Sequence, residues 1–240
     1  MSQHTTKAGS KLIRLEAIPC VISRRASRFT VEVYTDRAEL AYLCNTGRLK
    51  QYIAGGKVGY CIKSPGRKTS LRLVAVEDME LAAVVDTRLQ MKAFEKAAAL
   101  KLIPWMRGFR VSRRNPRLGS SRVDYLLECS SGEACLEVKS AVMRRGHYAL
   151  YPDCPTPRGR RHIMELASHA RGGGKAILLF IAAVPYARAF KPNREADPRL
   201  YELLLEAADA GVSFKAIGVH YNPSDSHIHL YSPDLEVSLT

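Results

Sequence analysis

Several features that define other protein classes are missing from this 240-residue sequence. The most apolar stretch, residues 176–184, is far too short to cross a bilayer, and the first twenty residues lack the apolar run of a signal peptide. The six cysteines contain no C-x-x-C pair, which excludes a zinc ribbon of the usual spacing and indicates reduced thiols. No G-K-[ST] triplet follows either glycine cluster, so a phosphate loop is not expected. These absences predict a cytoplasmic protein without a membrane role.

Acidic residues are scarce relative to basic ones. The chain has 37 Lys and Arg against 23 Asp and Glu, a net charge of +14. A positive field attracts polyanions, and binding gains free energy from the counterions that phosphates release. The charge therefore favours a nucleic-acid partner over a basic protein with no such role. The sequence has no recognisable helix-turn-helix or zinc finger, which predicts DNA binding through phosphates with little sequence preference.

Residues 11–85 have the pattern of short strands separated by turns. Phe29, Val31 and Val33 alternate with polar neighbours, the period-two pattern of a half-buried strand. Further strands are expected over residues 39–44, 58–63 and 71–76. Strands at roughly ten-residue spacing are typical of a small barrel or sandwich. We expect an OB-like β-barrel that binds nucleic acid over residues 1–86, with an SH3-like barrel as the alternative.

The pattern changes after residue 86. A helix is expected over residues 89–102, which are rich in Ala, Lys and Leu. Two more are expected from Thr156-Pro157 to 170 and from Asp197-Pro198 to 211, because a capping residue before a proline is typical of a helix start. Strands are expected over the following ranges: 121–128, 134–140, 175–184 and 212–219. This order predicts a mixed-sheet α/β domain over residues 87–240, so the whole chain combines a barrel with an α/β domain.

Two carboxylates and a lysine are expected to meet on this sheet. Side chains alternate along a strand, so Glu137 and Lys139 share one face of the strand over residues 134–140. A turn near residue 131 would place Asp124 opposite residue 137, 138 or 139. Two carboxylates can hold Mg²⁺ or Mn²⁺ and leave positions open for a substrate phosphate, while Lys139 positions a water or offsets charge. The alternative is an ordinary cross-strand ion pair.

Basic residues surround this constellation in the sequence and form the candidate nucleic-acid-binding set. Arginine suits phosphate because its planar guanidinium donates two parallel hydrogen bonds. The candidates are Arg48, Arg67, Lys68, Arg113, Arg114, Arg117, Arg122, Arg158 and Arg161. Helical spacing places Arg158, His162, Glu165 and His169 on one face of the expected helix. For His220, His227 and His229 an exposed polar tail is favoured over a metal site, because their spacing matches no standard set of ligands.

The sequence resembles the sugar fermentation stimulation protein A (SfsA) family from about residue 29 to residue 239. The most specific segments are S-R-V-D-Y at residues 121–125, L-E-V-K-S at 136–140, and Y-P-D at 151–153 with the P-T-x-R-G stretch at 155–159. Asn45-Thr46-Gly47 and Arg67-Lys68-Thr69 match in the first segment. The resemblance implies an N-terminal OB domain and a C-terminal domain similar to PD-(D/E)xK nucleases, with Asp124, Glu137 and Lys139 at the motif positions.

The resemblance also implies a DNA-binding role linked to sugar utilisation. This sequence departs from the family pattern at one position. Lys96 stands where relatives usually have a glutamate, and Glu95 precedes it by one position. The leading hypothesis is a DNA-binding protein with a Mg²⁺- or Mn²⁺-dependent nuclease site. The alternatives are a non-catalytic DNA-binding regulator that keeps the nuclease fold and an RNA-binding accessory protein that uses the barrel.

Overall fold

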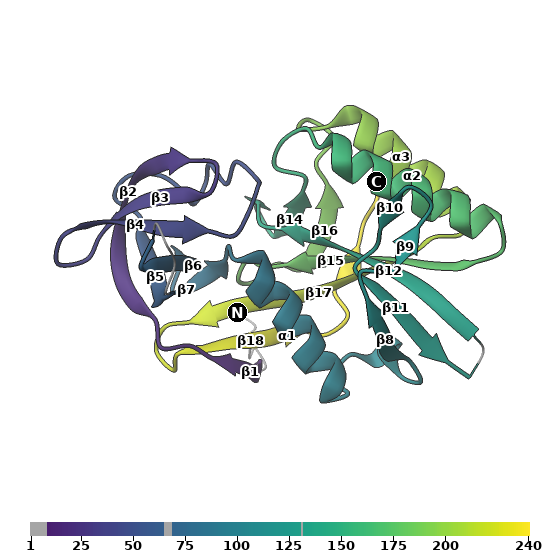
Figure 1. The fold of residues 1–240 in the computed structure, drawn as a ribbon, viewed down its shortest axis with the longest axis horizontal. Coiled ribbons are helices and arrows are strands. Elements are labelled where there is room, and N and C mark those ends of the chain that lie inside the picture. Colours follow the sequence, from purple (N-terminus) through teal and green to yellow (C-terminus); the bar gives the residue numbers. More distant parts are fainter. Residues whose placement is uncertain (1–8, 65–68, 131) are drawn as a thin grey trace, which may run out of the picture.

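The structure, a computed structural model, describes residues 9–64, 69–130 and 132–240. It consists of a small barrel and a larger part in which helices cover a sheet (Figure 1). This combination of an OB-like barrel with a mixed-sheet α/β domain is the expected fold class.

Five strands close the barrel. They are β2 (Ile18–Ser27), β3 (Thr30–Tyr34), β4 (Ala38–Leu43), β5 (Val58–Lys63) and β6 (Leu71–Asp78). β2 pairs with β3 and β5, β3 with β4, and β5 with β6, all antiparallel, while β4 pairs with β6 in parallel and completes the ring. Inward positions carry apolar side chains such as Val31, Val33 and Leu73, which are fully buried. The alternation of Val31 and Val33 therefore fills the interior of a closed barrel, whereas Phe29 lies in the turn before β3 and is exposed.

The larger part is built on a mixed sheet whose centre is parallel. Its strands are β7 (Leu81–Val84), β17 (Ser213–Asn222), β15 (Lys175–Ala182), β12 (Gly132–Ala141), β11 (Tyr125–Cys129) and β8 (Arg110–Arg114), in that spatial order. β15 pairs in parallel with both β12 and β17, and its last seven residues are buried. A continuous apolar run is what a strand covered on both faces requires.

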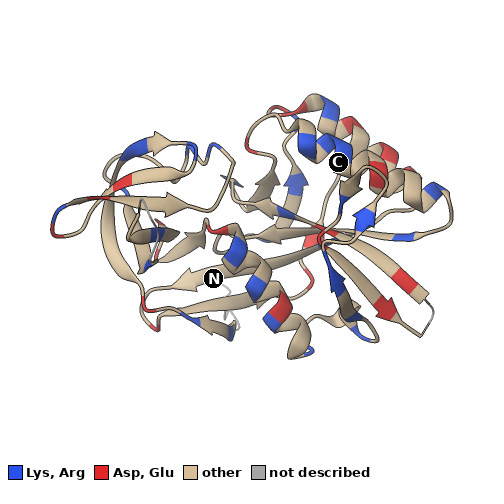
Figure 2. Cartoon of the chain, in the orientation of Figure 1, with Lys and Arg blue, Asp and Glu red and all other residues tan. Residues whose placement is uncertain are grey.

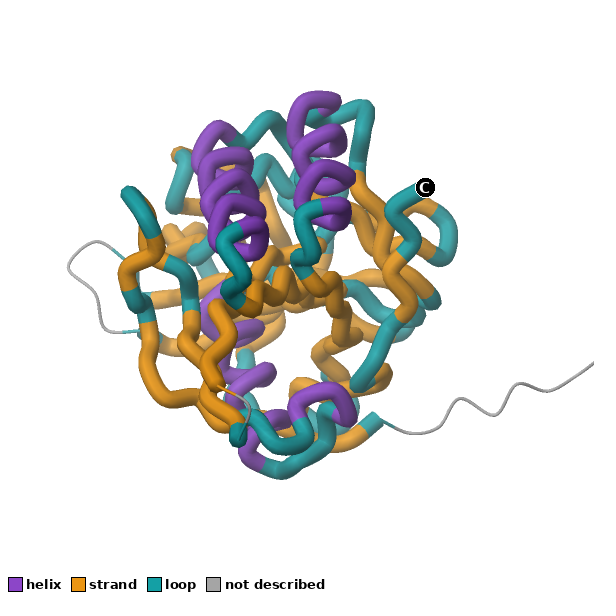
Figure 3. The backbone as a smooth tube through the Cα atoms, turned by 90° about the vertical axis from the view of Figure 1, so that its right-hand side faces the viewer, coloured by secondary structure: helices purple, strands orange, loops and turns teal. Residues whose placement is uncertain are grey.

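Three helices cover the two faces of this sheet. α2 (Pro157–Arg171) and α3 (Pro198–Asp209) lie side by side on one face, and α1 (Thr87–Ala99) lies on the other (Figure 3). Thr156 and Asp197 cap α2 and α3 by accepting hydrogen bonds from the backbone N–H groups of Gly159 and Leu200. The predicted starts of these two helices are confirmed. In the described part of the chain, no helix is both long and apolar enough to span a membrane.

The remaining short elements complete the frame around the sheet. They are β1 (Ser10–Arg14), η1 (Pro104–Met106), β9 (Arg117–Leu118), β10 (Ser121–Arg122), β13 (Arg144–Arg145), β14 (Tyr148–Tyr151), β16 (Ala189–Pro192), β18 (His227–Ser232) and β19 (Glu236–Val237). The single strand expected over residues 121–128 is divided, because β10 ends at Arg122 and β11 begins at Tyr125. Asp124 lies in this break.

The two parts share one continuous sheet. β7 follows directly on the barrel strand β6 and also pairs with β17 of the larger part. β1, at the start of the described chain, pairs with β18 near its end. A side-chain contact reinforces the junction, since Arg144 forms an ion pair of 2.9 Å with Asp78, which also accepts a hydrogen bond from Tyr52. The barrel is thereby held against the sheet that carries the motif residues.

Candidate metal and nucleic-acid site

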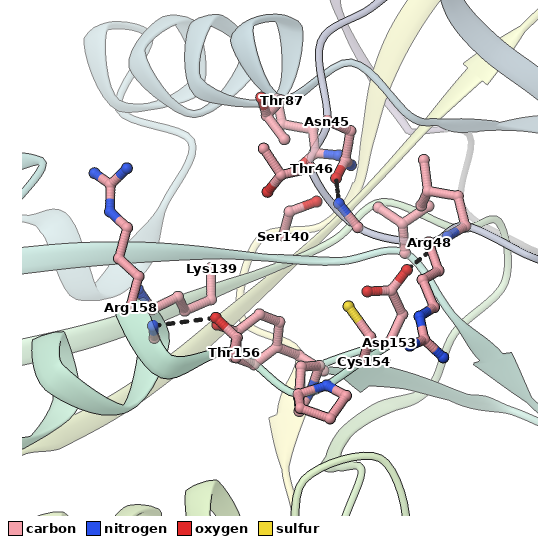
Figure 4. Close-up of a pocket in the computed structure, with 18 of the residues that line it drawn as sticks. Asn45, Thr46, Arg48, Thr87, Lys139, Ser140, Asp153, Cys154, Thr156 and Arg158 are labelled. Atoms are coloured by element: carbon pink, nitrogen blue, oxygen red, sulfur yellow. Dashed lines mark hydrogen bonds between the residues drawn. The ribbon is translucent and has the colours of Figure 1, made fainter. Parts of the chain in front are cut away.

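A cleft of about 980 Å³ lies where the barrel meets the larger part. One wall comes from the barrel, mainly residues 45–50, and the other from β12, the segment after β14 and the start of α2. Figure 4 shows labelled residues of both walls, with Asn45, Thr46 and Arg48 on the barrel side and Lys139 and Ser140 on β12. Asp124, Glu137 and Lys139 all line this cleft.

Pairing between β11 and β12 brings the three motif residues together. Tyr125 lies opposite Leu136, so Asp124 falls beside Glu137, within the predicted register. The Oδ2 atom of Asp124 accepts a hydrogen bond of 2.7 Å from the backbone N–H of Val138. Lys139 Nζ donates to Glu137 Oε1 at 2.5 Å, and both of these side chains are buried. The predicted shared face of Glu137 and Lys139 is confirmed.

His162 is a fourth member of this group that sequence reasoning placed on the right helix face but not in the site. Its Nδ1 atom lies 2.5 Å from Glu137 Oε1, and its ring is buried. Arg158, one turn earlier on α2, donates from Nε to His162 Nε2 at 3.3 Å. Because Nε2 accepts this bond, the proton of a neutral ring lies on Nδ1 and is donated to Glu137. The i, i+4 spacing of Arg158 and His162 at the helix start was the available signal.

The surroundings shift the pKa values of the two carboxylates, Asp124 and Glu137, in opposite directions. Burial and the neighbouring Glu137 raise the pKa of Asp124 to about 6. Burial also disfavours the charge of Glu137, but Lys139 and His162 outweigh it and lower the pKa of Glu137. Burial opposes the charge of Lys139, yet Tyr151, Glu137 and Asp124 together raise the pKa of Lys139. Glu137 therefore stays ionised, while Asp124 titrates near pH 6.

The donor atoms fit a divalent cation. Glu137 Oε2 is buried and has no hydrogen-bond partner among the described residues, although Oε1 of the same carboxylate accepts two bonds. A buried carboxylate oxygen without a partner is costly, and a hard cation would remove that cost. The described residues contain no group of three or more His, Cys, Asp or Glu placed to hold a metal. A cation here would therefore keep open positions for water or a phosphate, as Mg²⁺ commonly does.

The barrel wall of the cleft carries four basic side chains. Arg25, Arg28, Arg48 and Lys50 line the cleft, but only Arg48 was expected from the sequence. Arg25 holds the wall in shape, because its Nη1 atom donates to the carbonyl oxygens of Gly47 and Arg48 at 2.7 and 2.6 Å. The backbone N–H of Leu49 donates to Asp153 Oδ2 at 2.6 Å and fixes the wall against the opposite side.

Most of the other candidate arginines lie elsewhere. Arg48 and Arg158 line the cleft, whereas the exposed side chains Arg113, Arg114, Arg117, Arg122 and Arg161 do not. Arg67 and Lys68 lie outside the described residues. Figure 2 shows Lys and Arg spread over both parts of the molecule rather than gathered on one element. The cleft therefore contains a small part of the positive charge.

The chain matches known proteins along most of its length. The model of the SfsA N-terminal OB domain matches residues 24–85, and that of the sugar fermentation stimulation protein RE domain matches residues 88–225. The chain belongs to the sugar fermentation stimulation protein family. A homologue from Pyrococcus furiosus is 48% identical over 88% of this chain and 92% of its own, and one from Archaeoglobus fulgidus is 44% identical over 95% and 99%.

A solved structure agrees with the fold. The SfsA protein of Pyrococcus furiosus, solved in complex with Ca²⁺, superposes with a TM-score of 0.91 at 45% identity. The superposition covers 95% of this chain and 99% of that one. The predicted family membership is confirmed.

One position separates this SfsA chain from the pattern implied by the resemblance. Lys96 is exposed, and neither it nor Glu95 lines the cleft, to which α1 contributes Thr87, Gln90 and Met91. Glu95 is instead bound by the hydroxyl of Tyr125 and by Arg114, both at 2.7 Å. In this structure α1 therefore brings no carboxylate to the acidic pair.

The histidines near the end of this SfsA chain do not form an exposed tail, so that prediction was wrong. His220 and His229 are buried opposite each other on β17 and β18, with ring centroids 5.4 Å apart. His229 Nε2 lies 3.0 Å from Asp225 Oδ2. Pairing of two long strands, which the spacing of three histidines does not reveal, buries these rings.

Proposed function

We propose that this protein binds nucleic acid in the cleft and hydrolyses phosphodiester bonds there with a divalent cation held by Asp124 and Glu137. The observation that carries the proposal is the buried, unpartnered Oε2 of Glu137 beside Asp124, in a cleft whose opposite wall is cationic. A divalent cation beside Arg and Lys side chains suits phosphodiester cleavage, because these positive charges offset the negative charge of the transition state. The related Pyrococcus furiosus protein was solved in complex with Ca²⁺, a hard cation that takes oxygen ligands, which supports a divalent cation as the cofactor proposed here.

In this proposal each residue of the site has its own role. Asp124 and Glu137 hold the cation, and His162 and Lys139 keep Glu137 ionised and aimed by binding its Oε1 atom. When bound, Mg²⁺ or Mn²⁺ polarises a phosphoryl oxygen and lowers the pKa of a coordinated water. The ammonium of Lys139, beside Glu137 at the cleft, would offset negative charge that develops on the phosphate. Arg48 and Arg158 bind phosphates beside the scissile one.

DNA is the proposed substrate, recognised with little sequence preference. RNA is the alternative substrate, and a cleavage assay on both nucleic acids distinguishes the two. The cations that line the cleft would contact phosphates, and phosphate contacts carry no sequence information. Affinity should therefore fall steeply as the salt concentration rises. The slope of log affinity against log salt concentration should be proportional to the number of phosphates neutralised. A complex insensitive to salt would contradict this part of the proposal.

A second candidate is a DNA-binding protein that retains the fold without turnover. The observation that favours it is the α1 position, where Lys96 is exposed and Glu95 is engaged by Tyr125 and Arg114, so that only two carboxylates reach the site. Two ligands bind a cation more weakly than three. Under this candidate the protein binds DNA at physiological metal concentrations but leaves it intact.

The deciding experiment is a cleavage assay with labelled single- and double-stranded DNA and RNA. The parent protein is compared with Lys139→Ala and with Arg171→Ala, a control at the exposed end of α2. We expect cleavage with Mg²⁺ or Mn²⁺, none with chelator, and loss of cleavage in Lys139→Ala only. Binding without cleavage of any substrate would favour the second candidate, and cleavage retained in Lys139→Ala would refute the assignment of the site.

A further inference from the structure

The barrel carries an unusual concentration of exposed apolar side chains on one side. Val21, Phe29, Tyr34 and Leu40 are 45, 43, 55 and 43% exposed. They make up half of the eight large hydrophobic residues exposed in the described part of the chain. Single exposed hydrophobic residues need no explanation, but a group of them on one surface marks an interaction site.

Strand register gathers these residues on one surface, which we call the barrel face. Val21 of β2 lies opposite Tyr34 of β3, and Leu40 of β4 lies opposite Glu32 of β3. Because alternate side chains point outward, these strands present Val21, Tyr34 and Leu40 together. Tyr42, opposite Thr30, extends the row toward the turn that holds Phe29. Figure 1 shows the three strands side by side in the barrel.

Two arginines accompany the aromatic rings of the barrel face. The guanidinium of Arg28 lies 5.4 Å from the ring centroid of Phe29, and that of Arg88 lies 5.9 Å from Tyr42. Two of the acids nearby are matched, since Glu32 pairs with Arg24 at 2.7 Å and Glu39 with Arg37 at 3.7 Å. Neither Arg28 nor Arg88 has an ion pair among the residues that the structure describes. Rings with excess guanidinium charge are complementary to bases joined by phosphates.

The barrel face is continuous with the cleft. Arg28 lines the cleft, and its neighbour Phe29 begins the exposed row. A chain bound in the cleft by Arg48 could therefore pass Arg28 and continue over Phe29, Tyr42 and Leu40 without leaving the protein surface.

We propose that the barrel face binds single-stranded nucleic acid and guides it into or out of the cleft. The inference rests on the proposed function, and it adds that the strand reaching the cleft is unpaired. Aromatic side chains stack on bases only where the bases are not already stacked and paired within a duplex. A duplex would meet the same arginines but would leave Phe29 and Tyr34 without partners.

The test compares two double variants of the full chain. Phe29→Ala with Tyr34→Ala removes rings from the barrel face, and Leu100→Ala with Met164→Ala removes side chains of comparable exposure elsewhere. Binding of fluorescent oligothymidylate of about 20 nucleotides, longer than the site of one OB domain, and of a duplex of the same length is measured by anisotropy at low salt with chelator. Both double variants should fold normally because the substituted residues are exposed.

We expect the barrel-face variant to lose about tenfold or more in affinity for oligothymidylate and about twofold or less for duplex. The control should match the parent protein on both. An unchanged affinity for oligothymidylate, or equal losses on the two probes, would overturn the inference. A parent that sediments as a dimer and a barrel-face variant that sediments as a monomer would also overturn it, because the face would then contact a second copy.

The two proposals can fail separately. If Arg48→Ala with Arg158→Ala weakens binding of both probes while the barrel-face variant weakens neither, nucleic-acid binding in the cleft stands and this inference is wrong. If the parent protein binds neither probe at low salt, the proposed function itself is wrong and the inference falls with it.

Discussion

The Nδ1 atom of His162 lies 2.5 Å from Oε1 of Glu137, and this contact joins α2 to the motif strand β12. Lys139 binds the same oxygen, so both hydrogen bonds fall on one side of the carboxylate. The other oxygen, Oε2, is left buried without a partner among the described residues. The orientation of the Glu137 side chain therefore depends on α2, which begins about twenty residues later in the chain.

His162→Ala should weaken divalent-metal affinity by about 10- to 100-fold, because loss of a group that orients a metal ligand typically costs that much. The measurement is a Mn²⁺ titration by calorimetry. His169→Ala, on the same helix but outside the cleft lining, serves as control and should bind like the parent. Equal affinities in all three proteins would show that His162 does not position Glu137.

Lys139→Ala should destabilise the protein by about 3 kcal/mol, because it breaks a buried ion pair and leaves Glu137 less compensated. The free energy of unfolding is measured by urea denaturation without metal. Arg145→Ala removes an ion pair whose partners are exposed and should cost far less stability than Lys139→Ala. A cost for Lys139→Ala as small as that for Arg145→Ala would mean that the buried pair contributes little.

Metal affinity should rise with pH up to about 6 and then level off. The pKa of Asp124 is raised to about 6, so below this pH a proton occupies the carboxylate and competes with the cation. Affinity should fall about tenfold for each pH unit below 6, since one proton is displaced. Titrations at several pH values measure the slope. A flat profile between pH 5 and about 7 would exclude Asp124 as a titrating ligand.

Arginines of the cleft should matter more for DNA binding than those of the loop around β8 and β9. Arg48→Ala with Arg158→Ala removes two cations that line the cleft, whereas Arg113→Ala with Arg117→Ala removes two exposed ones outside it. We expect the first variant to lose several-fold more affinity and to reduce the salt slope by about 2. The melting temperature of both should stay within a few degrees of the parent. A larger loss of DNA affinity in Arg113→Ala with Arg117→Ala than in the cleft variant would place the DNA-binding surface over β8 and β9.

Local patterns predicted the elements of the fold well. Alternation in β3, the apolar run of β15 and the capped starts of α2 and α3 are each set by neighbouring residues. The meeting of Asp124, Glu137 and Lys139 was also predictable, because a short turn fixes the register of β11 and β12. The pairing of β1 with β18 was not, since it joins residues more than two hundred positions apart.

The composition of the cleft was harder to predict for the same reason. His162 enters through the packing of α2, and Arg25, Arg28 and Lys50 enter because the barrel is held against the sheet. No spacing rule relates residue 28 to residue 137. Charge counting predicted a nucleic-acid partner and assigned most of the binding to arginines that the structure places outside the cleft.

Calorimetric titration of Mn²⁺ into the parent protein and into Asp124→Asn tests the central claim most directly. Asparagine keeps the shape of the side chain and removes its charge, so only the proposed liganding role is changed. The account predicts saturable binding at a single site in the parent and a loss of about tenfold or more in Asp124→Asn. Absence of binding in the parent, or equal binding in the two proteins, would contradict it.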